Sequence, residues 1–172
     1  MTPDLDPLCN ILGQVLPAQG LVLEIASGDG DNIAELARRF GHLAWQPSEL
    51  DPNALAAIEA RHGQLGLPNL LRPVALDVTT MPWPVAKADA IICLDTVHVI
   101  AWDSVLALFG GAARTLQSGG LLFLHGPFKF HGKYSSPQNE ELDQSLRSRD
   151  RATGLRDIRE LTVTGTRTGI GL

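Results

Sequence analysis

Short, nearly continuous apolar runs alternate with longer amphipathic segments, and this alternation constrains the fold more than any other feature of the chain. Runs of strand length occupy residues 21–26, 42–47, 70–76, 89–94 and 121–125. Segments with helical spacing of apolar residues occupy residues 5–16, 32–40, 52–63, 102–116 and 136–148. Strands that alternate with helices form a parallel sheet covered on both faces. The sequence therefore predicts an α/β fold with three layers, α/β/α.

The composition excludes several classes of protein. No apolar run approaches the length of about 20 residues that a membrane-spanning helix needs. The N-terminus is acidic and no long apolar run follows it, so we expect no signal peptide. Cys9 and Cys93 lie far apart and outside any metal-binding pattern, so we expect neither a disulfide nor a metal site. Residues 1–128 carry 6 basic and 13 acidic side chains, which disfavours a nucleic-acid partner. Arginines over residues 147–159 alternate with acids, which is typical of a solvated helical face. We expect a cytoplasmic protein that binds neither membranes nor nucleic acid.

The first predicted strand ends in a turn with two glycines and two acids, Ala-Ser-Gly-Asp-Gly-Asp over residues 26–31. Ligands of parallel sheets bind beside the carboxyl ends of the strands, and glycines let the backbone approach them closely. A dinucleotide site would need a third glycine, where Ile33 stands, and Asp29 and Asp31 would repel a pyrophosphate. The turn therefore favours S-adenosylmethionine, which has a cationic sulfonium and amino group and no phosphate, over a dinucleotide.

Acids also stand at the ends of the next two predicted strands. Glu49 follows the second strand, where its carboxylate could accept hydrogen bonds from both ribose hydroxyls; the alternative is an ordinary surface acid. Asp77 follows the third strand, where it could accept a hydrogen bond from the adenine amino group; the alternative is a cap on the following loop. Three successive strand ends thus carry acids that suit a nucleoside with a cationic tail.

Four stretches of the chain resemble a known family. They are residues 23–28, 45–48, 75–79 with 82–84, and 119–124 with 126–129. These stretches resemble the class I S-adenosylmethionine-dependent methyltransferases and, more closely, a methyltransferase-like family of bacteria and animals classed as a domain of unknown function. The resemblance extends over residues 7–158. It implies a Rossmann-like methyltransferase sheet with S-adenosylmethionine as the cofactor.

The resemblance also implies the residues of the site. Glu24 would orient the amino end of the methionine portion, and Leu94 and Asp95 would lie beside that portion and the reacting methyl group. The cofactor-binding residues that we expect are Glu24, Ala26, Gly28, Gly30, Glu49, Leu50, Asp77, Val78, Leu94 and Asp95. On the substrate side we expect His98, Lys129 and Tyr134; alternatively, His98 is a packed core histidine and the other two belong to a surface loop. The sequence identifies no catalytic base.

The end of the chain departs from the resemblance. Class I methyltransferases close their sheet with a helix and an antiparallel strand pair, and too few residues follow Arg156 to form both. We expect a single domain over residues 1–161, lacking that strand pair, and a short tail over residues 162–172, with either an exposed sheet edge or a disordered tail. An exposed edge would favour marginal stability or a homodimer. The function that we expect is methyl transfer to a small-molecule acceptor; the alternative is a catalytically inactive donor-binding or regulatory protein.

Overall fold

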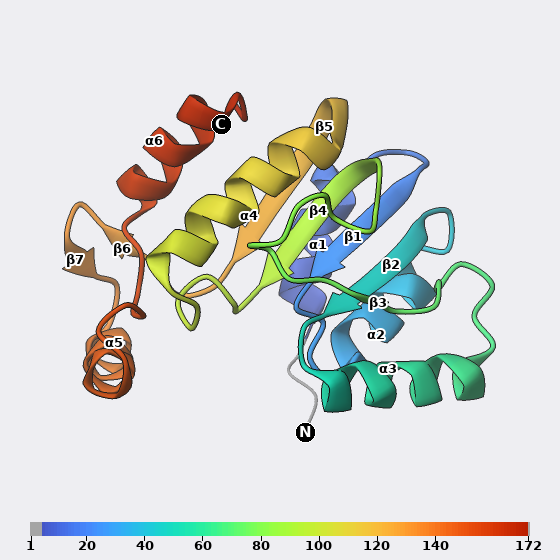
Figure 1. Ribbon diagram of the computed structural model, residues 1–172, viewed down its shortest axis with the longest axis horizontal. Helices are drawn as coiled ribbons and strands as arrows, with labels where there is room; N and C mark the ends of the chain where they lie inside the picture. Colours follow the sequence, from blue (N-terminus) through green and yellow to red (C-terminus); the bar gives the residue numbers. More distant parts are fainter. Residues whose placement is uncertain (1–4, 172) are drawn as a thin grey trace.

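A five-stranded parallel sheet organises the computed structural model, which describes residues 5–171 (Figure 1). The strands are β1 (Leu21–Ile25), β2 (Ala44–Glu49), β3 (Val74–Ala75), β4 (Ala88–Leu94) and β5 (Leu116–His125). Their spatial order is β3-β2-β1-β4-β5, and every neighbouring pair is parallel. The order of the strands therefore reverses between β1 and β4, where α/β proteins of this kind bind ligands.

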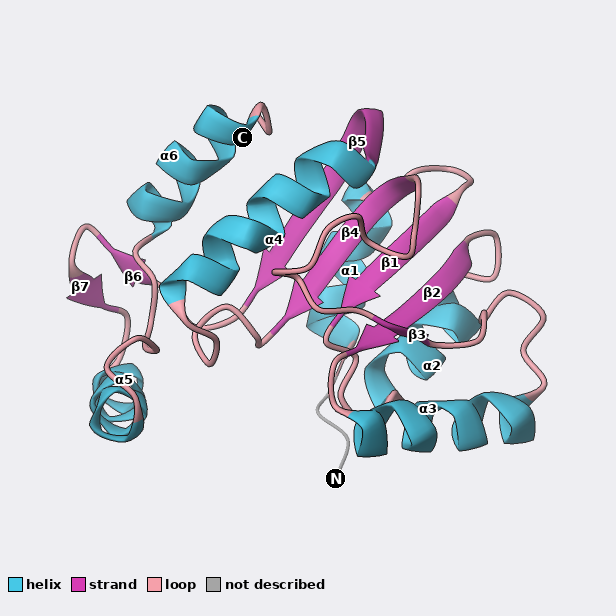
Figure 2. Cartoon of the chain, viewed as in Figure 1, coloured by secondary structure: helices cyan, strands magenta, loops and turns pink. Residues whose placement is uncertain are grey.

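Helices cover both faces of the sheet (Figure 2). Residues 5–171 form the helices α1 (Asp6–Val15), α2 (Asp31–Arg39), α3 (Pro52–Leu65), α4 (Trp102–Thr115), α5 (Pro137–Arg149) and α6 (Ile158–Thr168). None of these helices combines the length and the apolar character that crossing a membrane would require.

Alternate residues of β4 show why both faces must be covered. Ala90 and Ile92 pack in one core with α1 and α2, whereas Ile91 and Cys93 pack in a second core with α4 and α6. Strand side chains point to opposite faces with a period of two, so a strand buried on both faces is apolar throughout. The predicted three-layer α/β/α architecture is thus confirmed.

The segment between β5 and α6, residues 126–157, forms a small unit that we call the insert. It contains an antiparallel hairpin of β6 (Lys129–Phe130) and β7 (Lys133–Tyr134), followed by α5. In Figure 1 the insert lies at the lower left, toward which the arrowheads of β4 and β5 point. The insert therefore stands beside the carboxyl ends of these two strands.

The end of the chain differs from the expected tail, because residues 162–168 continue helix α6. Asp157 caps this helix in a capping box with Glu160, and Leu161 is buried in the core that contains α4. The spacing Asp-x-x-Glu is a helix-start signal that the sequence already contained. Within the described residues no antiparallel pair extends the sheet beyond β5, as the sequence predicted.

Several element boundaries also differ from the prediction. Strand β5 begins at Leu116 rather than at residue 121, and its pairing with β4 shifts register between Ala88 and Ala90. Strand β3 is shorter than residues 70–76, with only an isolated bridge at Leu70. Helix α3 passes through Gly63 and ends at Gly66, whose left-handed conformation closes it.

Candidate functional site

One carboxylate joins the glycine turn after β1 to the end of β2. The backbone N–H of Gly28 donates to Oε2 of Glu49 at 2.9 Å, and the N–H of Leu50 donates to Oε1 of Glu49 at 2.8 Å. Gly28 has a φ of +58° and Gly30, the first residue before α2, a φ of +80°, both in the region that favours glycine. The structure therefore brings together the turn and the acid that the sequence assigned to the same ligand.

Glu24 is a buried acid in β1, directly before this turn. Its side chain is 2% exposed, and Oε2 has no hydrogen-bond partner among the described residues. Burial raises the pKa of Glu24 to about 7; a hydrogen bond with Ser27 opposes this rise, and the carboxylates of Glu49 and Asp29 add to it. Leaving a buried polar atom unpaired costs about 1–3 kcal/mol. A cationic amino group would satisfy the free oxygen and offset the repulsion between acids, so this site fits the amino end of S-adenosylmethionine.

The remaining residues expected on the donor side lie on the same edge of the sheet. Ala26, with a φ of +57°, connects Glu24 to the glycine turn, and Leu50 is 62% exposed directly after Glu49. Leu94 is buried at the end of β4, and Asp95, with a φ of +50°, follows it. Strands β1 and β4 are hydrogen-bonded neighbours, so these residues flank the point where the strand order reverses.

Asp77 has the loop-capping role that the sequence offered as an alternative. Its Oδ1 accepts hydrogen bonds from the backbone N–H of Thr79 at 2.8 Å and from the Thr79 hydroxyl at 2.7 Å. These hydrogen bonds lower the pKa of Asp77. Val78, the next residue, is half-buried, and its carbonyl accepts from the indole N–H of Trp83 at 3.3 Å. A contact between Asp77 and adenine stays a prediction.

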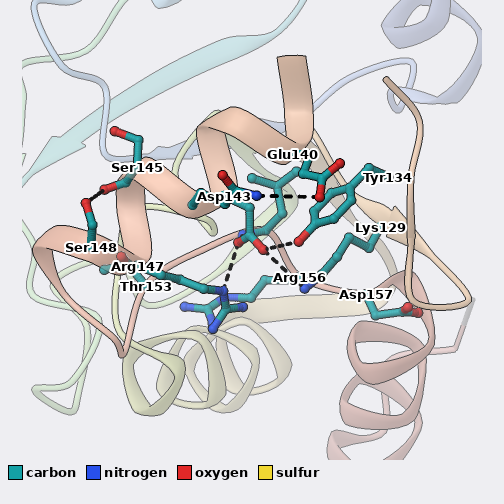
Figure 3. Close-up of polar contacts among 12 residues, drawn as sticks. Lys129, Tyr134, Glu140, Asp143, Ser145, Arg147, Ser148, Thr153, Arg156 and Asp157 are labelled. Atoms are coloured by element: carbon teal, nitrogen blue, oxygen red, sulfur yellow. Dashed lines mark hydrogen bonds and ion pairs between the residues drawn. The ribbon is translucent and has the colours of Figure 1, made fainter. Parts of the chain in front are cut away.

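Lys129 and Tyr134, both expected on the substrate side, converge on a buried carboxylate that the sequence did not reveal (Figure 3). The Tyr134 hydroxyl donates to Oδ2 of Asp143 at 2.7 Å, and Nζ of Lys129 lies 3.6 Å from the same oxygen. Arg147 Nε donates to Oδ1 of Asp143 at 3.0 Å. Asp143 is 2% exposed and joins the hairpin to α5. The polar groups of Lys129 and Tyr134 therefore hold the insert together, and a role in substrate binding stays a prediction.

Arg156 anchors the insert to the loop between β4 and α4. Its Nε donates to the carbonyl of Val97 at 3.1 Å, and its Nη2 donates to the carbonyls of Ile100 at 2.6 Å and Ala152 at 2.9 Å. The guanidinium also lies 5.4 Å from the ring centroid of Trp102. Arg156 is only 6% exposed, so it is not part of the solvated face that the charge pattern indicated. A lone arginine in an alternating charge run carries no signal of such a role.

His98 lies on the loop that Arg156 anchors. It is buried, and its backbone carbonyl accepts a hydrogen bond from the N–H of Gly154 at 2.8 Å, a second contact between this loop and the insert. His98 therefore stands where the loop after β4 meets the insert.

Solved structures, among them methyltransferases, share this fold. YcgJ from Bacillus subtilis matches with a TM-score of 0.73 at 18% identity, over 94% of this chain and 66% of that protein. An O-methyltransferase family protein from Burkholderia thailandensis matches with a TM-score of 0.79 at 16% identity, over 96% of this chain and 50% of the other. CalO1, a methyltransferase in calicheamicin biosynthesis solved with SAH bound, matches with a TM-score of 0.72 at 18% identity, over 92% of this chain and 46% of its own. This chain thus spans about half to two thirds of the length of these structures, and it has the class I methyltransferase fold.

The comparison of sequences identifies the family. A family model described as "Protein of unknown function (DUF938)" matches residues 3–172, which is nearly the whole chain. The fold, the acidic strand ends and the match along the chain agree with one another. The chain belongs to the DUF938 family.

Proposed function

We propose that this chain binds S-adenosylmethionine at the carboxyl ends of β1 to β4 and transfers its methyl group to a small molecule. One observation carries the proposal: the unpaired Oε2 of buried Glu24 lies beneath a glycine turn that Glu49 holds in place. A buried acid with one unpaired oxygen, near the carboxylates of Glu49 and Asp29, is suited to a cationic ligand and unsuited to a phosphate.

Glu49 can serve the turn and the ligand at once. A carboxylate offers about four lone-pair sites. Each oxygen of Glu49 accepts backbone N–H hydrogen bonds, Oε2 from Gly28 and Oε1 from Leu50 and Asp51. These three hydrogen bonds leave about one site, on Oε2, which can accept a ribose hydroxyl and would fix the nucleoside relative to β1 and β2.

Methyl transfer needs placement more than it needs covalent chemistry from the protein. When bound, S-adenosylmethionine supplies a methyl group on a positively charged sulfur that leaves as a neutral thioether. Glu24 would hold the amino end and Glu49 the ribose, so that the methyl group faces the ends of β4 and β5. Fixing both reactants in line accounts for much of the barrier reduction in such reactions. The SAH named in the CalO1 structure supports the choice of donor.

The test has two stages. Calorimetric titration should show that S-adenosylmethionine and S-adenosylhomocysteine bind and that NAD does not. The protein should then move label from methyl-labelled S-adenosylmethionine into a small molecule of a metabolite extract. Binding of NAD without S-adenosylmethionine would contradict the donor site. Donor binding without transfer in broad extracts would leave the donor site intact and point to a catalytically inactive binding protein.

A further inference from the structure

His98 contains a polar atom that the folded chain leaves unsatisfied. The residue is 7% exposed, and its Nδ1 has no hydrogen-bond partner among residues 5–171. An unpaired buried polar atom destabilises the folded state. A histidine that served only to fill the core would destabilise the fold with no compensating interaction, because an apolar side chain of similar size would avoid the unpaired atom.

The unpaired nitrogen borders a small space in front of Gly126. A Cβ atom built on Gly126 would lie 3.4 Å from Nδ1 of His98 and 3.5 Å from Oδ1 of Asp95. Gly126 has a φ of +153°, which side chains rarely adopt, so this position stays open. The three residues follow two neighbouring strands, since Asp95 and His98 come after β4 and Gly126 comes after β5.

This space adjoins the donor site described above. The carboxylates of Glu24 and Asp95 add to the effect of burial in raising the pKa of the Cys93 thiol in β4. Cys93 is the register partner of Ile25 in β1 on one side and of Leu124 in β5 on the other. Asp95, two residues after Cys93, therefore follows the strand that lies between β1 on the donor side and β5, which leads to Gly126.

The charges around His98 suit a group that accepts a proton at neutral pH. Burial lowers the pKa of His98, the cation of Arg156 in the insert lowers it further, and the carboxylate of Asp95 opposes both. Because its pKa lies below the ordinary value, the imidazole is uncharged at neutral pH and can accept a proton. Asp95 is also 3.5 Å from Nδ1 of His125, at the end of β5. Once His98 takes a proton, the nearby carboxylate stabilises the resulting imidazolium.

We propose that His98 is the general base of the methyl transfer, with Asp95 as its positioning residue, and that the acceptor is a small molecule with a hydroxyl or amino group at Gly126. This inference rests on the proposed function. The acceptor oxygen or nitrogen forms a bond to the methyl carbon, and the carbon–sulfur bond breaks with its electron pair remaining on sulfur. The acceptor's proton passes to Nδ1 of His98 and from there to water. Acceptors that are already anionic need no such base, so a built proton acceptor points to a protic substrate.

The first experiment removes the basic nitrogen and keeps the shape. His98→Asn retains a polar atom near the position of Nδ1 but cannot take up a proton. We expect calorimetric binding of S-adenosylmethionine to stay within about twofold of the parent. We expect transfer of methyl label into the metabolite extract to fall about 100-fold or more, the usual share of a general base. His42→Asn, at an exposed histidine before β2, is the matched control and should change neither quantity.

The second experiment distinguishes a base from a packed histidine by its pH dependence. The transfer rate of the parent should rise with pH along the deprotonation of His98, which nitrogen NMR of the imidazole reports independently. Asp95→Asn removes the carboxylate that favours the imidazolium, so the NMR pKa of His98 and the limb of the rate profile should both move to lower pH. Asp95 is exposed, so this variant tests the proposal even if His98→Asn does not fold.

The outcomes separate this inference from the donor site. Full transfer by His98→Asn, or a rate profile that ignores the NMR pKa of His98, would overturn the base. Donor binding by the parent without any transfer would also overturn it while the donor site stands. Failure of the parent to bind S-adenosylmethionine would instead defeat the proposed function itself.

Discussion

The two sides of the candidate site are built in different ways. On the donor side, Glu24, Gly28 and Glu49 belong to two adjacent strand ends, and side-chain hydrogen bonds of Glu49 and Ser27 join the turn to the neighbouring strand. On the acceptor side, the loop after β4 is held by Arg156, which lies 59 and 56 residues away from the two carbonyls of that loop that it binds. The donor side is thus local in sequence, whereas the acceptor side depends on long-range contacts. Substitutions on the donor side should therefore weaken ligand binding, whereas those at the Arg156 anchor should first destabilise the fold.

The largest effect that we expect is from Arg156→Ala, which would break the acceptor side apart. The substitution removes a buried cation together with its three hydrogen bonds. The carbonyls of Val97, Ile100 and Ala152 then lack this donor. We expect the free energy of unfolding to fall by about 3–5 kcal/mol, because three hydrogen bonds to a charged group are lost and each contributes about 1.5–3 kcal/mol before water reaches the freed carbonyls. Chemical denaturation would measure it.

Two variants sharpen this prediction. Arg156→Lys keeps the charge but not the planar fork, so part of the loss should remain. Arg151→Ala removes an exposed arginine of the same segment and should change stability by less than about 0.5 kcal/mol. If Arg156→Ala were as mild as Arg151→Ala, the acceptor side would not depend on this anchor.

Glu49→Ala tests the donor side, where we expect a loss of ligand binding rather than a loss of stability. It should weaken S-adenosylmethionine binding by about 1.5–3 kcal/mol, the range for hydrogen bonds to a charged group, with a smaller effect on folding. Glu59→Ala is the control, since it removes an equal charge from α3, where Glu59 pairs with Arg72. Calorimetry on both variants would decide; unchanged binding in Glu49→Ala would make Glu49 a structural acid only.

The third prediction concerns pH and Glu24. Binding of a cationic donor should lower the raised pKa of Glu24 and release a proton. Affinity should therefore rise about tenfold between pH 5.5 and 7, since one pKa unit corresponds to about 1.4 kcal/mol. Titrations in buffers of different ionisation enthalpy would count the proton released, and Glu24→Gln should abolish the pH dependence.

The same shift affects folding without the donor. Unfolded Glu24 ionises near 4.5, whereas folded Glu24 keeps its proton until about pH 7. The folded state then binds more protons than the unfolded state, so the contribution of Glu24 to stability falls as pH rises through this interval and levels off above it. The parent should lose more stability over this interval than Glu24→Gln. Equal pH dependence in the two proteins would contradict the buried, unpaired state of Glu24.

The smallest effect belongs to Asp77→Ala. Thr79 already supplies two hydrogen bonds to Asp77 Oδ1, so we expect a loss of less than about 1 kcal/mol in S-adenosylmethionine binding. Adenine also stacks on apolar side chains, which would retain most of its affinity. A loss as large as that of Glu49→Ala would show that adenine recognition depends on Asp77 and would make the third strand end an equal part of the donor side.

Much of the donor side could be predicted because residue type and position along the chain are enough to locate its members. Glycines at 28 and 30 mark a turn, and the acids at 24 and 49 stand at the ends of strands that the apolar pattern already located. In a parallel sheet these ends lie on one edge, so position along the chain determines position in space. Asp77 shows the limit of this rule, because the residues next in the chain competed for its carboxylate.

The acceptor side could not be predicted in this way. Asp143 and Arg156 resemble other charges in an alternating run, and only the packing of the insert buries both. The capping box at Asp157 was readable, but the apolar pattern after it is weak, so the helix at the end of the chain was missed. Burial of a charge depends on which distant segments meet around it, and a single sequence does not contain that information.

Two neighbouring glycines separate what the sequence determines from what the tertiary structure decides. By pattern, Gly110 and Gly111 are equivalent, and each weakens helix α4 by about 1 kcal/mol. In the structure a Cβ on Gly111 would overlap the ring of Trp83, whereas a Cβ on Gly110 would meet nothing within 4 Å. The sequence by itself determined the order of strands and helices, the two-sided sheet and the acidic strand ends, because these follow from local periodicity and chain connectivity. Only the tertiary structure decided which glycine admits Trp83, which arginine anchors the insert and which histidine is left without a partner, because each depends on side chains that approach from distant parts of the chain.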